Sequence, residues 1–191
     1  MRFRNFWRSL PAPALPELLA LRVVMATQLV FGTFIPVVPS YTASLEYDVK
    51  AAFLFNFTKF VQWPAAFASA EAPFTICIVG EDPFGRTLDD LVQGESVSGH
   101  RINVQRLQGD TQNSCQLEYV AKNNSIPANA LEAGSGVLTV GEGDEFVRRG
   151  GMVGFVIDDR RVRFDISLKA AANAGLKLSS KLLAVARSVE K

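Results

Sequence analysis

Four carboxylates at two expected strand ends are the residues of this sequence best suited to bind a ligand. Glu81 and Asp82 follow an apolar run at 74–79, and Glu142 and Asp144 follow a second apolar run at 136–140. Ligand sites in α/β folds often lie at such strand ends, and carboxylate oxygens suit a divalent cation. The same residue types also favour turns and helix starts for structural reasons alone, so both interpretations stay open.

Little else in the sequence indicates catalysis. A nucleophile needs a neighbouring base, and the single histidine, His100, lies in an expected loop beside Arg101. One histidine and two cysteines do not supply a tetrahedral zinc site. There is no G-x-S-x-G elbow, and the glycines at 80–85 and 134–136 lack the Gly-Lys-Ser/Thr of a phosphate-binding loop. We therefore expect a protein that is not an enzyme and has no cofactor.

The first 44 residues have the layout of a secretory signal peptide. They start with Arg2, Arg4 and Arg8, continue with an apolar stretch at 23–38, and end in small or polar residues at 39–44. Removal of residues 1–44 would leave a protein that begins at Leu45 and works outside the cytoplasm. The alternative is an uncleaved membrane anchor. The apolar stretch is short for a span of ~20 residues and contains Gln28.

The remaining residues, 45–191, suit one domain with one core. Of the 20 basic and 19 acidic side chains in the chain, four basic and one acidic lie in residues 1–44. The rest is therefore close to neutral. A nucleic-acid-binding protein needs a concentrated basic face, so we expect no nucleic-acid partner.

Cys77 and Cys115 are expected to form a disulfide, because two thiols in one domain of an oxidising compartment usually pair. The closed loop is about 40 residues long, which the chain-entropy model equates with roughly 3–4 kcal/mol. The alternative is that both are reduced and serve as small buried apolar residues. The strongly apolar surroundings of Cys77 keep that alternative open.

Strands and short helices are expected to alternate after residue 47. The apolar run at 74–79 is short and β-branched and does not alternate, which indicates a central strand covered on both faces. The other expected strands are 102–107, 115–120, 136–140, 152–157 and 162–166, and the expected helices are 47–63, 84–92, 127–133, 144–149, 168–174 and 176–189. This order predicts an α/β fold, namely a layered α/β/α domain with a mostly parallel central sheet and a late antiparallel hairpin.

An aromatic set recurs at helical spacing on the expected helix 47–63. Its members are Phe53, Phe57, Phe60 and Trp63. If they are exposed, they form a surface for another protein, since large apolar patches mark binding sites. The alternative is core packing, which a short helix of this composition normally provides.

Several motifs are similar to those of the YfiR family and occur in the same order. They are YDVKAAFLFNFTKFVQWP at 47–64, GEDPFG at 80–85, GGMVGF at 150–155, FDISL at 164–168, Ala171, AGL at 174–176 and SSKLL at 179–183. The chain therefore resembles this family from Tyr47 to its C-terminus. Ser167 stands where the family usually has asparagine.

The resemblance implies a small periplasmic α/β protein that is often a homodimer. It implies a negative regulator that binds the periplasmic sensor region of an inner-membrane diguanylate cyclase and holds the cyclase inactive. Such a regulator lowers cyclic di-GMP and biofilm formation. An outer-membrane lipoprotein that sequesters the repressor is the second partner that the resemblance implies.

The resemblance also bears on the cysteines. The resemblance implies tuning by redox state through two disulfide pairs. Cys77 and Cys115 match the first pair, and residues 136–154 contain no cysteine for a second one. The residues alone leave another function open, that of a periplasmic small-molecule-binding sensor module. Its ligand would bind at the turns around Glu81–Asp82 and Glu142–Asp144.

Overall fold

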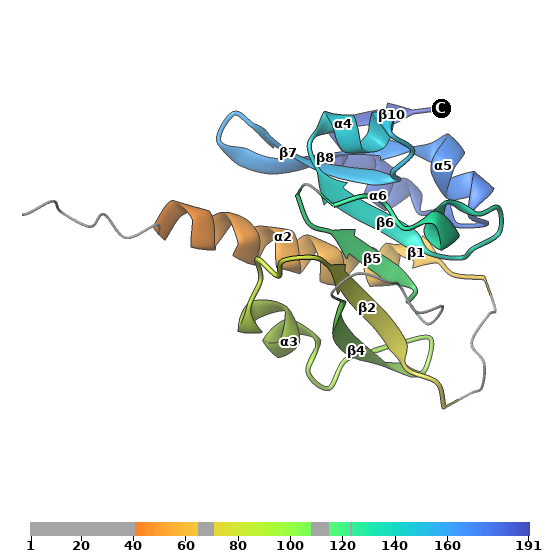
Figure 1. The fold of residues 1–191 in the computed structure, drawn as a ribbon, viewed down its shortest axis with the longest axis horizontal. Coiled ribbons are helices and arrows are strands. Elements are labelled where there is room, and N and C mark those ends of the chain that lie inside the picture. Colours follow the sequence, from red (N-terminus) through yellow and green to blue (C-terminus); the bar gives the residue numbers. More distant parts are fainter. Residues whose placement is uncertain (1–40, 65–70, 108–114, 123) are drawn as a thin grey trace, which may run out of the picture. The chain divides into compact units, whose positions relative to one another are not determined.

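The computed structural model describes residues 41–64, 71–107, 115–122 and 124–191 (Figure 1). These residues belong to one compact unit, Ser40–Lys191. Apart from residues 41–44, the predicted signal peptide lies outside the described residues. None of the helices in the described part of the chain combines the length and the hydropathy that crossing a bilayer requires.

Helices and strands alternate along the described residues. In chain order the elements are α2 (Tyr41–Phe60), β1 (Val61–Gln62), β2 (Phe74–Val79), α3 (Arg86–Val92), β3 (Ser96–Val97), β4 (His100–Leu107), β5 (Leu117–Val120), the 3₁₀ helix η1 (Ala128–Leu131), β6 (Leu138–Glu142), α4 (Asp144–Arg148), β7 (Val153–Asp158), β8 (Arg161–Ser167), α5 (Leu168–Asn173), β9 (Lys177–Leu178), α6 (Ser180–Val185) and β10 (Ser188–Glu190).

Within the described ranges, eight strands form the central sheet in the order β10-β8-β7-β6-β5-β2-β4-β3. The pairs from β4 through β2, β5 and β6 to β7 are parallel, and so is the pair of β10 with β8. β7 and β8 form an antiparallel hairpin, and β3 pairs antiparallel with β4. The prediction of a mostly parallel sheet with a late hairpin is confirmed.

Helix α2 packs along one face of this sheet (Figure 1). Ala51, Leu54 and Phe57 recur at helical spacing and are fully buried. They belong to one core cluster with Ile76 and Ile78 of β2. Every residue of β2 is buried, so the prediction of a central strand covered on both faces is confirmed.

Helix α4 covers the opposite face. Val140 of β6 belongs to the core cluster beneath α2, and successive residues of a strand point to opposite faces, so Gly141 faces away from α2. A Cβ atom at Gly141 would lie 2.3 Å from the ring of Phe146 on α4. Glycine is therefore required for this close approach, and the layered α/β/α arrangement is confirmed.

Two helix predictions were wrong by more than two residues, and His100, which was expected in a loop, is the first residue of β4. The helix expected at 47–63 begins at Tyr41 and ends at Phe60, because Val61 leaves it to pair with Leu178 of β9. The single helix expected at 176–189 is replaced by β9, α6 and β10. Ser179 caps a new helix by accepting a hydrogen bond from the Leu182 amide, and Arg187 then binds Asp165 and aligns β10 with β8.

Candidate functional site

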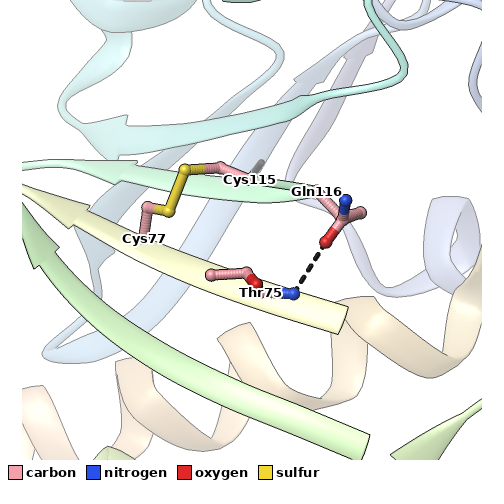
Figure 2. Close-up of a disulfide and its surroundings, with 4 residues drawn as sticks. All are labelled: Thr75, Cys77, Cys115 and Gln116. Carbon is pink, nitrogen blue, oxygen red and sulfur yellow. Dashed lines mark hydrogen bonds between the residues drawn. A yellow bond between two sulfur atoms is a disulfide. The ribbon is translucent and has the colours of Figure 1, made fainter. Parts of the chain in front are cut away.

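The structure contains the expected disulfide between Cys77 and Cys115 (Figure 2). Cys77 lies on β2 and Cys115 lies just before β5, with their Cα atoms 5.8 Å apart and both residues buried. Beside the bridge, the Thr75 amide donates to Gln116 Oε1 at 2.7 Å. These bonds tie the start of β5 to its parallel neighbour, β2. None of the cysteines in the described residues is free.

A polar cluster joins α2 to the ends of β5 and β6. Lys50 on α2 is 2% exposed. Its Nζ lies 3.0 Å from Glu142 Oε1 at the end of β6 and 2.5 Å from Glu46 Oε1. The Tyr119 hydroxyl on β5 donates to the same Glu142 oxygen at 2.6 Å, and Lys50 Nζ lies 4.3 Å from the Tyr47 ring centroid. One buried lysine therefore neutralises a carboxylate that β6 brings to the helix and that Tyr119 of β5 also contacts.

The ionisation of this cluster follows from its contacts. Burial favours a higher pKa for Glu142, but hydrogen bonds from Tyr119 and Lys50 and the charge of Lys50 lower that pKa below its ordinary value. Burial and the nearby Glu142 raise the pKa of Tyr47 to about 12. The same two causes also raise the pKa of Tyr119. Glu142 is therefore a charged acceptor held by neutral phenols and a lysine, and it serves to anchor the helix.

At the other predicted turn, Arg106 holds the carboxylates. Asp82 Oδ1 accepts from the Phe84 amide at 2.7 Å, and Asp82 Oδ2 lies 2.7 Å from Arg106 Nε. Arg106 also contacts Asp89 of α3 at 2.5 Å, and this hydrogen bond lowers the pKa of Asp89. The Asp82 turn is therefore a joint between β2, β4 and α3.

The four predicted ligand carboxylates thus fall into different surroundings. Glu142 is satisfied by Lys50 and Tyr119, and Asp82 by Arg106. Glu81 is exposed, and it acts with Glu142 on the pKa of Tyr47. Asp144 is exposed and pairs with Arg148 at 3.4 Å. Among the described residues, no group of three potential ligands could hold a metal ion.

The predicted aromatic face is divided between the core and the surface. Phe57 is fully buried and stacks on Phe155 of β7. Phe53 is partly buried and lies edge-on to Phe164 of β8, with ring centroids 5.3 Å apart. Trp63 packs edge-on against Phe74 of β2. Phe60 is 36% exposed. The four residues do not form one exposed surface, because Phe53, Phe57 and Trp63 pack against side chains of the sheet.

Lys50 is not among the site residues predicted from the sequence. Its position was the available signal: it lies four residues before Leu54 and seven before Phe57, on the stripe that faces the core. A lysine on such a stripe needs an anionic partner. Nothing in the local pattern identifies Glu142, which is 92 residues away.

Comparison with known proteins decides the family. The model of the YfiR/HmsC-like family matches residues 47–187. The chain belongs to this family. No curated protein sequence matches it. A solved structure described as a conserved domain protein from Vibrio cholerae O1 biovar El Tor strain N16961 is 12% identical, with a TM-score of 0.44; the match covers 75% of this chain and 60% of that one.

Removing the disulfide of this YfiR/HmsC-like protein should destabilise it strongly. The bridge joins residues 38 positions apart, and the chain-entropy model gives a loss of about 4 kcal/mol for a loop of this length. We expect the double variant Cys77→Ala and Cys115→Ala to lose about that much unfolding free energy in urea. Wild-type protein with the bridge reduced is the matched control. An unchanged midpoint in both would contradict a stabilising bridge.

Replacing Lys50 with methionine should destabilise the protein by about 3 kcal/mol, because it leaves Glu142 buried without its cation. Adding Glu142→Gln should recover a large part of that loss. Because the pKa of Glu142 is lowered on folding, its contribution is present above its ordinary pKa and is lost as pH falls below it. Denaturation of both single variants and the double variant at pH 7 measures the coupling, and strictly additive effects would refute it.

Proposed function

We propose that this protein is a periplasmic regulator that binds the periplasmic sensor region of an inner-membrane diguanylate cyclase and holds the cyclase inactive. The family match over residues 47–187 carries the proposal. The YfiR/HmsC-like family suggests a regulator of cyclic di-GMP signalling rather than a catalyst. In this scheme the protein lowers cyclic di-GMP and biofilm formation, acts as a homodimer, and is sequestered by an outer-membrane lipoprotein.

Exposed apolar side chains support a partner surface on α2, but not at the aromatic set. Leu45 is 61% exposed and Val49 is 38% exposed, and their spacing of four residues puts them on one side of the helix. Ile157 in the β7–β8 hairpin is 53% exposed. The hairpin and the N-terminal half of α2 project at the same end of the domain (Figure 1). We assign the cyclase contact to Leu45, Val49 and Ile157, the α2–hairpin surface.

Deleting the gene in its own host should raise cyclic di-GMP and biofilm mass, and the wild-type gene should restore both. We expect a gene with Leu45→Glu and Val49→Glu to fail, because charges on the α2–hairpin surface would prevent apolar contact with the cyclase. Val185→Glu is the matched control, since Val185 is 56% exposed on α6. It should restore both phenotypes, and thermal melts should show that all variants are folded.

Unchanged cyclic di-GMP after deletion would contradict the regulatory function itself. Full restoration by the Leu45→Glu and Val49→Glu gene would contradict only the assigned surface. The two results therefore separate the proposal from its location.

A groove favours a second candidate function, that of a small-molecule sensor. Its volume is about 770 Å³, within the range of ligand pockets. Residues from η1, α4, α5 and β10 line it, among them Leu131, Arg148, Lys169 and Glu190. This groove does not include the predicted ligand turns, whose carboxylates Asp82 and Glu142 bind their own neighbours.

The sensor function predicts that a metabolite raises the melting temperature of the wild-type protein. Ala172→Trp would fill the groove from an exposed position on α5 and should abolish the shift. Ala184→Trp adds the same side chain at an exposed position of α6 outside the groove and should leave the shift intact. A flat response of the wild-type protein across a broad metabolite panel would count against this candidate.

A further inference from the structure

Glu118 is a buried carboxyl group that the sheet leaves unpaired. It lies in the middle of β5 and is 0% exposed. Among the residues that the structure describes, neither of its carboxyl oxygens has a hydrogen-bond partner. Leu117 and Tyr119 belong to the core beneath α2, so the alternation of a strand points Glu118 to the opposite face. The proposed regulatory function makes no use of this group.

The strands beside Glu118 present no charge to it. Its register partner on β2 is Cys77, whose sulfur is in the disulfide, and its partner on β6 is Thr139. Thr139 Oγ1 already accepts a hydrogen bond from the Met152 amide at 3.1 Å. On β4, the residue level with Cys77 is the neutral Gln105.

Charged groups elsewhere on this face lie on other elements. Arg163 of β8 is partly buried, and its Nε has no hydrogen-bond partner among the described residues, but β6 and β7 separate it from β5. Asp165 lies on β8, which β6 and β7 separate from β5, and it binds Arg187. On α4, Asp144 and Glu145 both bind Arg148 and are exposed. Burial is the only cause that raises the pKa of Glu118, which it moves to about 7. The described surroundings therefore favour the neutral acid, since an unpaired buried carboxylate is strongly disfavoured.

We propose that Glu118 is a proton-binding site that makes the stability of this domain depend on pH. The folded sheet accommodates the protonated side chain beside Cys77 and Thr139, and its ionisation places an uncompensated charge between β2 and β6. The destabilised region includes β5, which the disulfide ties to β2.

The direction of the effect follows from the two states. In the unfolded chain the carboxyl ionises near its ordinary pKa of 4.5, whereas in the fold its pKa is about 7. Between these values the folded protein keeps a proton that the unfolded chain releases, so stability falls as pH rises. The contribution of Glu118 is therefore fully present below pH 4.5 and is lost by about pH 7. The unfolding constant should rise about tenfold for each pH unit in this window.

Urea denaturation of the purified protein at pH 5, 6, 7 and 8 tests the proposal. Glu118→Gln keeps the size of the side chain and cannot ionise. The unfolding constant of wild type, relative to that of Glu118→Gln, should therefore rise about tenfold for each pH unit between pH 5 and 7. Glu132→Gln removes an exposed carboxylate and should follow the wild-type profile. Parallel pH profiles for wild type and Glu118→Gln would overturn the proposal.

A direct titration of Glu118 in the wild-type protein tests the proposal even if Glu118→Gln fails to fold. The side-chain carboxyl of Glu118 in ¹³C-labelled wild-type protein should show its chemical-shift step near pH 7. A step near pH 4.5 would overturn the proposal. Neither result depends on whether the protein regulates a cyclase, so failure here leaves the proposed function standing.

Discussion

The packing of α2 on the sheet is the interaction on which the rest of the structure depends. Phe57 lies fully buried against Phe155 and Phe164, residues that β7 and β8 bring together. About two turns towards the N-terminus, Lys50 binds Glu142 at the end of β6. The apolar contact supplies most of the stabilisation, since burying one such aromatic side chain contributes about 1.5–3 kcal/mol. The ion pair fixes where the helix lies, because a shift of the helix would leave the part-buried Glu142 without its cation.

The buried polar groups on the two faces of β5 differ in whether they have hydrogen-bond partners. Tyr119 faces α2 and donates to Glu142, which a lysine also neutralises. Glu118 faces the other way, and neither of its carboxyl oxygens has a hydrogen-bond partner in the described part of the chain. The disulfide lies on this second face and holds β5 to β2 by a covalent bond. One face is thus stabilised by a helix and an ion pair. The other face contains a disulfide and a buried carboxyl group whose neutral form is favoured by burial.

The local sequence pattern predicted correctly those elements whose structure depends on nearby residues. The run at 74–79 is apolar and β-branched, and it is the central strand that this pattern predicts. The C-terminal region was predicted incorrectly because β9 and β10 exist only through pairing with Val61 and with Asp165 and its neighbours, far away in the chain. The Lys50–Glu142 pair could not be predicted for the same reason. Periodicity can indicate that Lys50 is buried, but only the folded sheet brings Glu142 close to it. The exposure of Leu45 and Val49 on α2 could not be predicted either. The apolar periodicity of the helix does not show where the sheet beneath it ends.

Three exposed apolar residues of this YfiR/HmsC-like protein, Leu45, Val49 and Ile157, lie outside the core. We propose that the α2–hairpin surface contacts a membrane cyclase directly. Photo-crosslinking in living cells, with a benzophenone amino acid at position 49 and the same residue at position 185 as control, tests this contact. The account predicts an adduct from position 49 alone, and mass spectrometry should identify the captured protein as an inner-membrane diguanylate cyclase. Equal capture of that protein from both positions, or no cyclase adduct from position 49, would contradict it.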